Sequence, residues 1–159
     1  MNSAFDITGA ITIAAWTKVT ELDSGYVEIV STNNYGLGLL SYGYKNDPNH
    51  VGPGYWYKND VWIEAELDVD NQWHLIVALY DGQEFALYID GKLCASKRFY
   101  KSIELGTSRL YIGQTPGNRN EGWKDGLIDD VRIYSYALSA EEVKMLYEGK
   151  EPPRAKGSD

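Results

Sequence analysis

The strongest constraint on the fold comes from two Asp-Gly dipeptides set between alternating apolar runs. Asp81-Gly82 and Asp90-Gly91 divide residues 73–97 into three such runs. Short apolar runs bounded by such turn signals are typical of strands. Asp-Gly suits a two-residue type I′ turn, because both central residues of that turn need positive φ. We therefore predict three antiparallel strands in a meander.

The rest of the chain favours strands and tight turns as well. Thirteen tyrosines, five tryptophans and 16 glycines are typical of a β protein. One helix is expected near the end, where Ser139 and Glu142 form a capping box and Gly149 ends the apolar pattern. Further strands are predicted at 11–18, 26–31, 35–44, 55–57, 61–69, 110–112 and 127–134, with loops at 45–54 and 114–122. The fold class predicted is all-β, a two-sheet antiparallel sandwich with one short C-terminal helix.

Size and charge limit the domain count and the partners. The 159 residues fit one domain, which we place at residues 1–149, with a linker or tail at 150–159. The chain has 23 acidic and 15 basic residues, a net charge of -8. Such a surface repels phosphate backbones and anionic headgroups, so no nucleic acid or membrane partner is expected. Neutral ligands or cations suit it better.

Three stretches match one known family in order and spacing. Residues 11–18 carry a strand of the form TI-x-x-W-x-K, and residues 73–91 carry the double hairpin. The most specific stretch, 110–147, contains GLIDDVRIY followed by ALSAEEV. Together they resemble the bacterial laminin-G-like jelly-roll domains of the concanavalin A-like lectin and glucanase superfamily. The resemblance implies two packed sheets and a role in extracellular adhesion and carbohydrate recognition, although fold alone does not fix function.

The main binding signal is a cluster of aromatic residues within 42–62. Adjacent residues of an extended segment point to opposite sides, so three consecutive rings at 55–57 cannot all enter the core. Aromatic rings offer a flat apolar face to sugars, and nearby polar groups can orient hydroxyls. The alternative is that these rings fill the core, because the chain has only three phenylalanines. The predicted carbohydrate-binding residues are Tyr44, Asp47, Asn49, His50, Tyr55, Trp56, Tyr57 and Trp62.

An enzymatic alternative rests on the acidic run at residues 66–70. Its Glu66, Asp68 and Asp70 resemble the E-x-D-x-E strand motif of concanavalin-like glucanases, in which two carboxylates about 5 Å apart cleave the glycosidic bond. Asp70 is one methylene shorter than the glutamate of that motif and lies at an expected turn. A solvated acidic strand face is favoured, and no catalysis is expected. No Ser, Cys or metal-ligand residue lies at a spacing from His74 that would indicate a catalytic triad or a metal site. We therefore expect His74 to be a packed or hydrogen-bonded structural residue.

Asp129 is the predicted metal ligand. The resemblance implies a structural calcium ion bound by Asp129 together with oxygens from an opening strand that would precede Asn2, and that strand is not found in the sequence. A hard cation takes six to eight oxygens, so one carboxylate and loop carbonyls supply only part of the set. The alternative is an edge aspartate that caps the backbone or pairs with Arg132. Calcium is therefore a possible structural cofactor.

These observations predict a non-catalytic carbohydrate-binding accessory module of a larger secreted protein, extracellular or at the cell surface. Its partner would be a polysaccharide or other glycan. Two alternatives stay open: an endo-glycosidase of the glucanase type, and a protein-binding adhesion domain stabilised by calcium. The start of the chain does not read as a signal peptide, so a secretion signal is expected outside the printed sequence.

Overall fold

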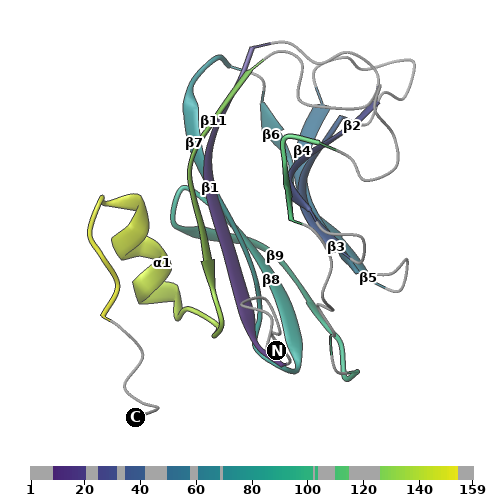
Figure 1. Cartoon of the computed structure of the whole chain (residues 1–159), viewed down its shortest axis with the longest axis vertical. Coiled ribbons are helices and arrows are strands. Elements are labelled where there is room, and N and C mark those ends of the chain that lie inside the picture. The colour runs from purple at the N-terminus through teal and green to yellow at the C-terminus, as the bar shows by residue number, and fades with distance from the viewer. Residues whose placement is uncertain are drawn as a thin grey trace.

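The chain folds into two antiparallel sheets packed face to face, with one helix on the outside (Figure 1). The computed structural model describes residues 9–20, 25–31, 35–41, 50–57, 61–68, 70–101, 103, 110–114 and 126–153. The first sheet has the order β11-β1-β7-β8-β9, and the second has the order β10-β2-β3-β4-β5, with β6 pairing with β4. This confirms the predicted all-β jelly-roll architecture.

The strand bounds agree closely with the predicted runs in the first sheet. Its strands are β1 (Ile11–Val19), β7 (Trp73–Tyr80), β8 (Glu84–Ile89), β9 (Lys92–Arg98) and β11 (Gly126–Tyr134). The second sheet contains β2 (Gly25–Ser31), β3 (Tyr35–Ser41), β4 (His50–Tyr57), β5 (Val61–Glu64), β6 (Leu67–Asp68) and β10 (Tyr111–Ile112).

The hydrophobic core lies between the sheets. β1, β7 and β8 contribute alternate residues to it from the first sheet, as the period of two requires. Tyr80 and Phe85 are fully buried and stack with ring centroids 4.4 Å apart. Ile29 of β2 and Ile63 of β5 close the core from the second sheet.

A second apolar cluster joins the outer face of the first sheet to the helix α1 (Ala140–Tyr147). Val143 and Leu146 are its buried helix residues. The predicted capping box is present: the Ser139 hydroxyl accepts from the backbone N–H of Glu142, and the Glu142 carboxylate accepts from the backbone N–H of Ser139. No helix among the described residues is long and apolar enough to cross a membrane.

The two Asp-Gly dipeptides form different turns. Asp90 and Gly91 both have positive φ, 52° and 76°, and Ile89 pairs with Lys92, so this is the predicted two-residue turn. The type I′ prediction is wrong for Asp81-Gly82, because only Gly82 has positive φ. There the Asp81 carboxylate accepts from the backbone N–H of Gln83 and of Glu84, which stabilises a longer loop.

Two predicted boundaries in the second sheet are also wrong. β4 begins at His50, inside the stretch predicted as a loop, because its glycines and proline pair with β3. The predicted strand 61–69 is divided into β5 and β6. The flanking pairs Gly54↔Glu64 and Val51↔Leu67 place Pro53 opposite the interruption, and proline has no N–H to donate to a ladder.

Candidate functional site

Two of the predicted binding tryptophans are direct neighbours across adjacent strands. Trp56 of β4 pairs with Trp62 of β5, and on its other side Trp56 pairs with Gly36 of β3. Residues directly opposite in an antiparallel pair share a sheet face, with Cβ atoms about 5 Å apart. The ladder therefore brings the two tryptophan positions together on one face.

The register separates these tryptophans from the two neighbouring tyrosines. Tyr55 pairs with Ile63, whose side chain is 5% exposed in the core, and Tyr57 pairs with Val61. Tyr55 and Tyr57 therefore occupy core-facing positions of β4. Trp56 and Trp62 occupy the alternate positions, on the sheet face away from the core.

Glycines occupy the positions beside the tryptophans on that outer face. Gly36 and Gly38 in β3, and Gly52 and Gly54 in β4, have the same register parity as Trp56. Glycine has no side chain, so another molecule can approach the backbone closely there. Glu64 shares this face, since it pairs with Gly54. The strip defined by Gly36, Gly38, Gly52 and Gly54 is called the glycine floor below.

Of the other residues predicted to bind the glycan beside these rings, only His50 lies within the described part of the chain. His50 begins β4 and pairs with Asp68 of β6, on the same register parity as the glycine floor. Tyr44, Asp47 and Asn49 lie outside the described residues. The contribution of these four residues to binding stays a prediction.

The acidic run considered for catalysis does not form one continuous strand. Glu66 is exposed and lies between β5 and β6, whereas Asp68 pairs with His50 in β6. The Asp70 carboxylate accepts from the backbone N–H of Gln72 at 2.9 Å and lies 3.1 Å from His74 Nε2. Asp70 therefore lies in a turn before β7. The glucanase-like motif would instead require Asp70 to continue the strand that carries Glu66 and Asp68.

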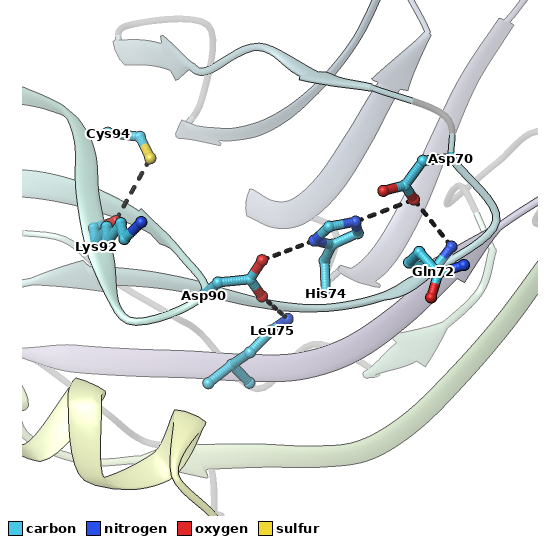
Figure 2. A network of polar contacts seen from close by, with 7 residues as sticks. All are labelled: Asp70, Gln72, His74, Leu75, Asp90, Lys92 and Cys94. Carbon is cyan, nitrogen blue, oxygen red and sulfur yellow. Dashed lines mark hydrogen bonds and ion pairs between the residues drawn. The ribbon is translucent and has the colours of Figure 1, made fainter.

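His74 lies between two carboxylates (Figure 2). Its Nδ1 is 2.7 Å from Asp90 Oδ2, and its Nε2 is 3.1 Å from Asp70 Oδ1. The other oxygen of Asp90 accepts from the backbone N–H of Leu75 at 2.9 Å. The imidazole thus links the turn before β7 to the turn between β8 and β9, which confirms its prediction as a hydrogen-bonded structural residue.

The carboxylates make His74 more basic. Burial lowers its pKa, but hydrogen bonds to Asp90 and Asp70, together with their negative charges, outweigh burial and raise the pKa above 6.5. The backbone N–H of Gln72 and the bond to His74 lower the pKa of Asp70. Both shifts favour the charged form of the network.

Asp129 and its neighbour Asp130 have different partners. Asp129 is exposed on β11, and its Oδ1 accepts from the backbone N–H of Asp130 at 2.8 Å. Asp130 has a φ of 46° and receives two bonds from Arg132, from Nε at 2.9 Å and from Nη2 at 2.7 Å. Arg132 also donates to Glu151. Asp129 therefore caps the backbone and Asp130 pairs with Arg132, as the alternative to a calcium site predicted.

A calcium site is not assembled by the residues described. Among them there is no group of three or more Asp, Glu, His or Cys side chains that could hold a metal ion. The Asp130 carboxylate is occupied by Arg132, which leaves Asp129 as one acidic donor. Calcium at Asp129 stays a prediction.

Two features were not predicted from the sequence: the contact of Asp90 with His74 and the cationic character of β9. Asp90 was interpreted only as a turn residue, although the β7–β8 pairing aligns it with the strand start that carries His74. Lys92, Lys97, Arg98 and Lys101 lie in a stretch without acidic residues, and this signal was visible in the sequence.

The two packed antiparallel sheets form a lectin-like β-sandwich. The chain belongs to the concanavalin A-like lectin/glucanases superfamily, whose laminin G-type family matches residues 2–144. A comparison with curated proteins found no match.

Solved structures share this fold at low sequence identity. The native heptameric SAP-like pentraxin from Limulus polyphemus is 17% identical with a TM-score of 0.68, and the match covers 89% of this chain and 71% of the pentraxin. The binding domain of Paraclostridial Mosquitocidal Protein 1 is 19% identical with a TM-score of 0.67, over 94% of this chain and 39% of that one. A candidate carbohydrate-binding protein from Bacteroides ovatus ATCC 8483 is 18% identical with a TM-score of 0.66, over 86% and 40%. The chain thus spans well under half of two of these proteins.

Proposed function

We propose that this chain is a non-catalytic module that binds a glycan on the outer face of β3, β4 and β5. The observation that carries the proposal is the cross-strand pair Trp56↔Trp62 on the face away from the core. Aromatic rings bind the apolar face of a sugar, and two adjacent ring positions suit consecutive sugar units of a polymer. Such a module would act as part of a larger extracellular protein.

The glycine floor supports this assignment. Four glycines beside the tryptophans leave the backbone of β3 and β4 open to close approach. Glu64 and His50 share the register parity of this face and could bond to sugar hydroxyls. Tyr44, Asp47 and Asn49, which precede His50 in the chain, are proposed to add polar contacts.

The acidic residues support binding without hydrolysis. Retaining cleavage needs two carboxyl groups about 5 Å apart on either side of the bond, one of them free to act as a nucleophile. The interruption between β5 and β6 removes the regular strand spacing, and Asp70 is held by Gln72 and His74. A hydrolase that uses Glu66, Asp68 or Asp70 is therefore the less favoured function.

A glycan array followed by product analysis tests the proposal. The polysaccharide that binds best would be used in affinity electrophoresis and in a reducing-end assay. We expect saturable retardation with no new reducing ends, and an unchanged result for Glu66→Gln. Reducing ends that appear with the wild type and are lost in Glu66→Gln would establish the hydrolase instead. No glycan binding, together with capture of a protein partner, would favour an adhesion domain.

A further inference from the structure

A network of three residues, His74, Asp70 and Asp90, fastens the chain where it passes from one sheet to the other. β6 pairs with β4 of the second sheet and β7 belongs to the first, so the connection from β6 to β7 joins the two sheets. Asp70 lies in this connection, two residues after β6 ends at Asp68, and Asp90 lies in the turn between β8 and β9. Figure 2 shows the two carboxylates on opposite sides of the imidazole ring. We call these three residues the His74 network.

The number of hydrogen bonds in the His74 network depends on the charge of the imidazole. A protonated ring donates from both nitrogens, so Nδ1 can bond to Asp90 while Nε2 bonds to Asp70. A neutral ring carries one proton, and its other nitrogen presents a lone pair. A lone pair and a carboxylate oxygen that face each other repel. One of the two contacts is therefore lost when His74 loses its charge.

The neutral ring keeps the contact with Asp90. Nδ1 lies 2.7 Å from Asp90 Oδ2, whereas Nε2 lies 3.1 Å from Asp70 Oδ1. The Asp90 side chain is 25% exposed and the Asp70 side chain 44%, so water replaces the imidazole more easily at Asp70. The remaining proton therefore stays on Nδ1. The lone pair of Nε2 then faces Asp70, and this contact is the one that is released.

The two carboxylates are the charges in contact with His74. On β1 the residue opposite His74 is Thr17, which is uncharged, and Lys18 has the parity of the other sheet face. Lys92 follows the Asp90 turn and is exposed, so solvent screens its charge. β4 begins with His50, whose pairing with β6 places it on the sheet face away from the core. The charge of the ring therefore decides whether the contact with the β6–β7 connection forms.

Release of Asp70 affects the short strand that precedes it. β6 is two residues long, and it is held to β4 by the pairs His50↔Asp68 and Val51↔Leu67. So short a ladder opens at a low cost in free energy. Next to Asp70, Asn71 has a φ of 60°, a left-handed conformation whose cost the contacts around it must offset. Loss of the Asp70 contact therefore favours separation of β6 from β4.

We propose that His74 regulates glycan binding with pH: the protonated ring holds β6 on β4 through Asp70, and the neutral ring releases β6. This inference rests on the proposed glycan-binding function and adds the regulation of the same surface. His50 and Asp68 share the register parity of the glycine floor, so separation of β6 loosens one end of that surface. A glycan must then order this end as it binds, which lowers affinity. Binding weakens but persists, because Trp56 and Trp62 pair farther along the ladder.

Nuclear magnetic resonance tests the release without any ligand. The ring nitrogen shifts of His74 should show the Nδ1–H tautomer above its titration midpoint. Amide exchange at residues 50–51 and 67–68, corrected for the intrinsic effect of pH, should accelerate about fivefold relative to that of β7 as His74 loses its proton. An Nε2–H tautomer, or exchange that does not follow the titration of His74, would overturn the inference.

Calorimetry at pH 6 and pH 9 tests the effect on binding, with the glycan that binds most tightly on the array. We expect the wild type to bind about threefold more weakly at pH 9. In Asp70→Asn the side-chain amide can donate to the neutral Nε2 while its oxygen still accepts from Gln72. This variant should therefore bind equally well at both pH values. His50→Gln removes the imidazole on the glycan-binding face, and its affinity should keep the pH dependence of the wild type.

The outcomes separate the regulation from the binding itself. Equal wild-type affinity at pH 6 and pH 9 would leave the proposed glycan binding intact and overturn the regulation. A pH dependence that persists in Asp70→Asn and disappears in His50→Gln would assign it to His50 and also overturn the inference. Absence of glycan binding at both pH values would refute the proposed function, and the exchange of β6 would still show whether His74 controls its release.

Discussion

Replacing His74 with glutamine tests the polar network that joins two turns of the first sheet. The pKa of His74 is raised in the folded protein. A group with a raised folded pKa stabilises the fold fully below its unfolded value, here 6.5, and this contribution is lost as the pH rises through the folded pKa. Asp70 has a lowered pKa, so its contribution is present above 3.8 and is lost as the pH falls through the folded value. The network should stabilise the protein most between these limits.

The expected magnitude follows from the two bonds. A hydrogen bond to a charged group contributes about 1.5 to 3 kcal/mol to the free energy of unfolding. The bond to Asp70 contributes less, because that carboxylate is 44% exposed. His74→Gln should therefore cost about 2 kcal/mol at pH 6. At pH 9 the neutral imidazole donates only one bond, and the cost should fall to about 1 kcal/mol.

Thermal unfolding from pH 5.5 to 9 measures the effect. For a domain of this size, 1 kcal/mol corresponds to about 2 to 4 °C in melting temperature. The gap between wild type and His74→Gln should narrow by this amount as the pH rises. Asp70→Asn is a second probe and should remove part of the same pH dependence. A gap that is constant or widens with pH would refute the reasoning.

Two further predictions concern the calcium site and the helix. If a cation bound at Asp129 stabilises the native state, excess chelator should lower the melting temperature of the wild type and leave that of Asp129→Ala unchanged. A wild-type melting temperature that does not change in chelator would contradict a structural calcium ion. Leu146→Ala, at a site that is 5% exposed, should cost about 2 to 5 kcal/mol in urea unfolding. Leu93→Ala, at a site that is 56% exposed, should stay within about 0.5 kcal/mol. Equal effects of the two leucine variants would contradict the described packing of α1.

Local signals predicted most of the first sheet. The strands at 73–97 are bounded by turn signals, and β7 and β8 are buried on both faces, one against the second sheet and the other against α1. The helix start was also predictable, because the Ser139–Glu142 capping box is a contact between residues three apart in sequence. In both cases the determining interactions are local.

The errors arose where pairing partners override local preference. Gly52, Pro53 and Gly54 favour a loop, yet they form part of β4 because β3 pairs with them. The Asp81-Gly82 turn lengthened because the Asp81 side chain bonds to the backbone that follows it.

The candidate site was predictable by residue type but not by register. Sequence composition identified the aromatic cluster at 55–62. Only the pairing of Tyr55 with Ile63 separates core-facing from outward positions in β4. His74 likewise required the folded chain, since its partners Asp70 and Asp90 come from different turns.

The central claim is that Trp56 and Trp62 form a glycan-binding surface. Its most direct test is calorimetric titration of the tightest-binding array glycan into wild type, Trp56→Ala and Trp56→Ala/Trp62→Ala, with the melting temperature measured for each. Loss of one ring contact should cost about 1.4 kcal/mol, or about tenfold in affinity, without a large change in melting temperature. Tyr55→Ala, at a core-facing position, should instead destabilise the fold. Full retention of binding in the double variant, or a loss of more than about 3 kcal/mol of stability in Trp56→Ala as for a buried tryptophan, would contradict the account.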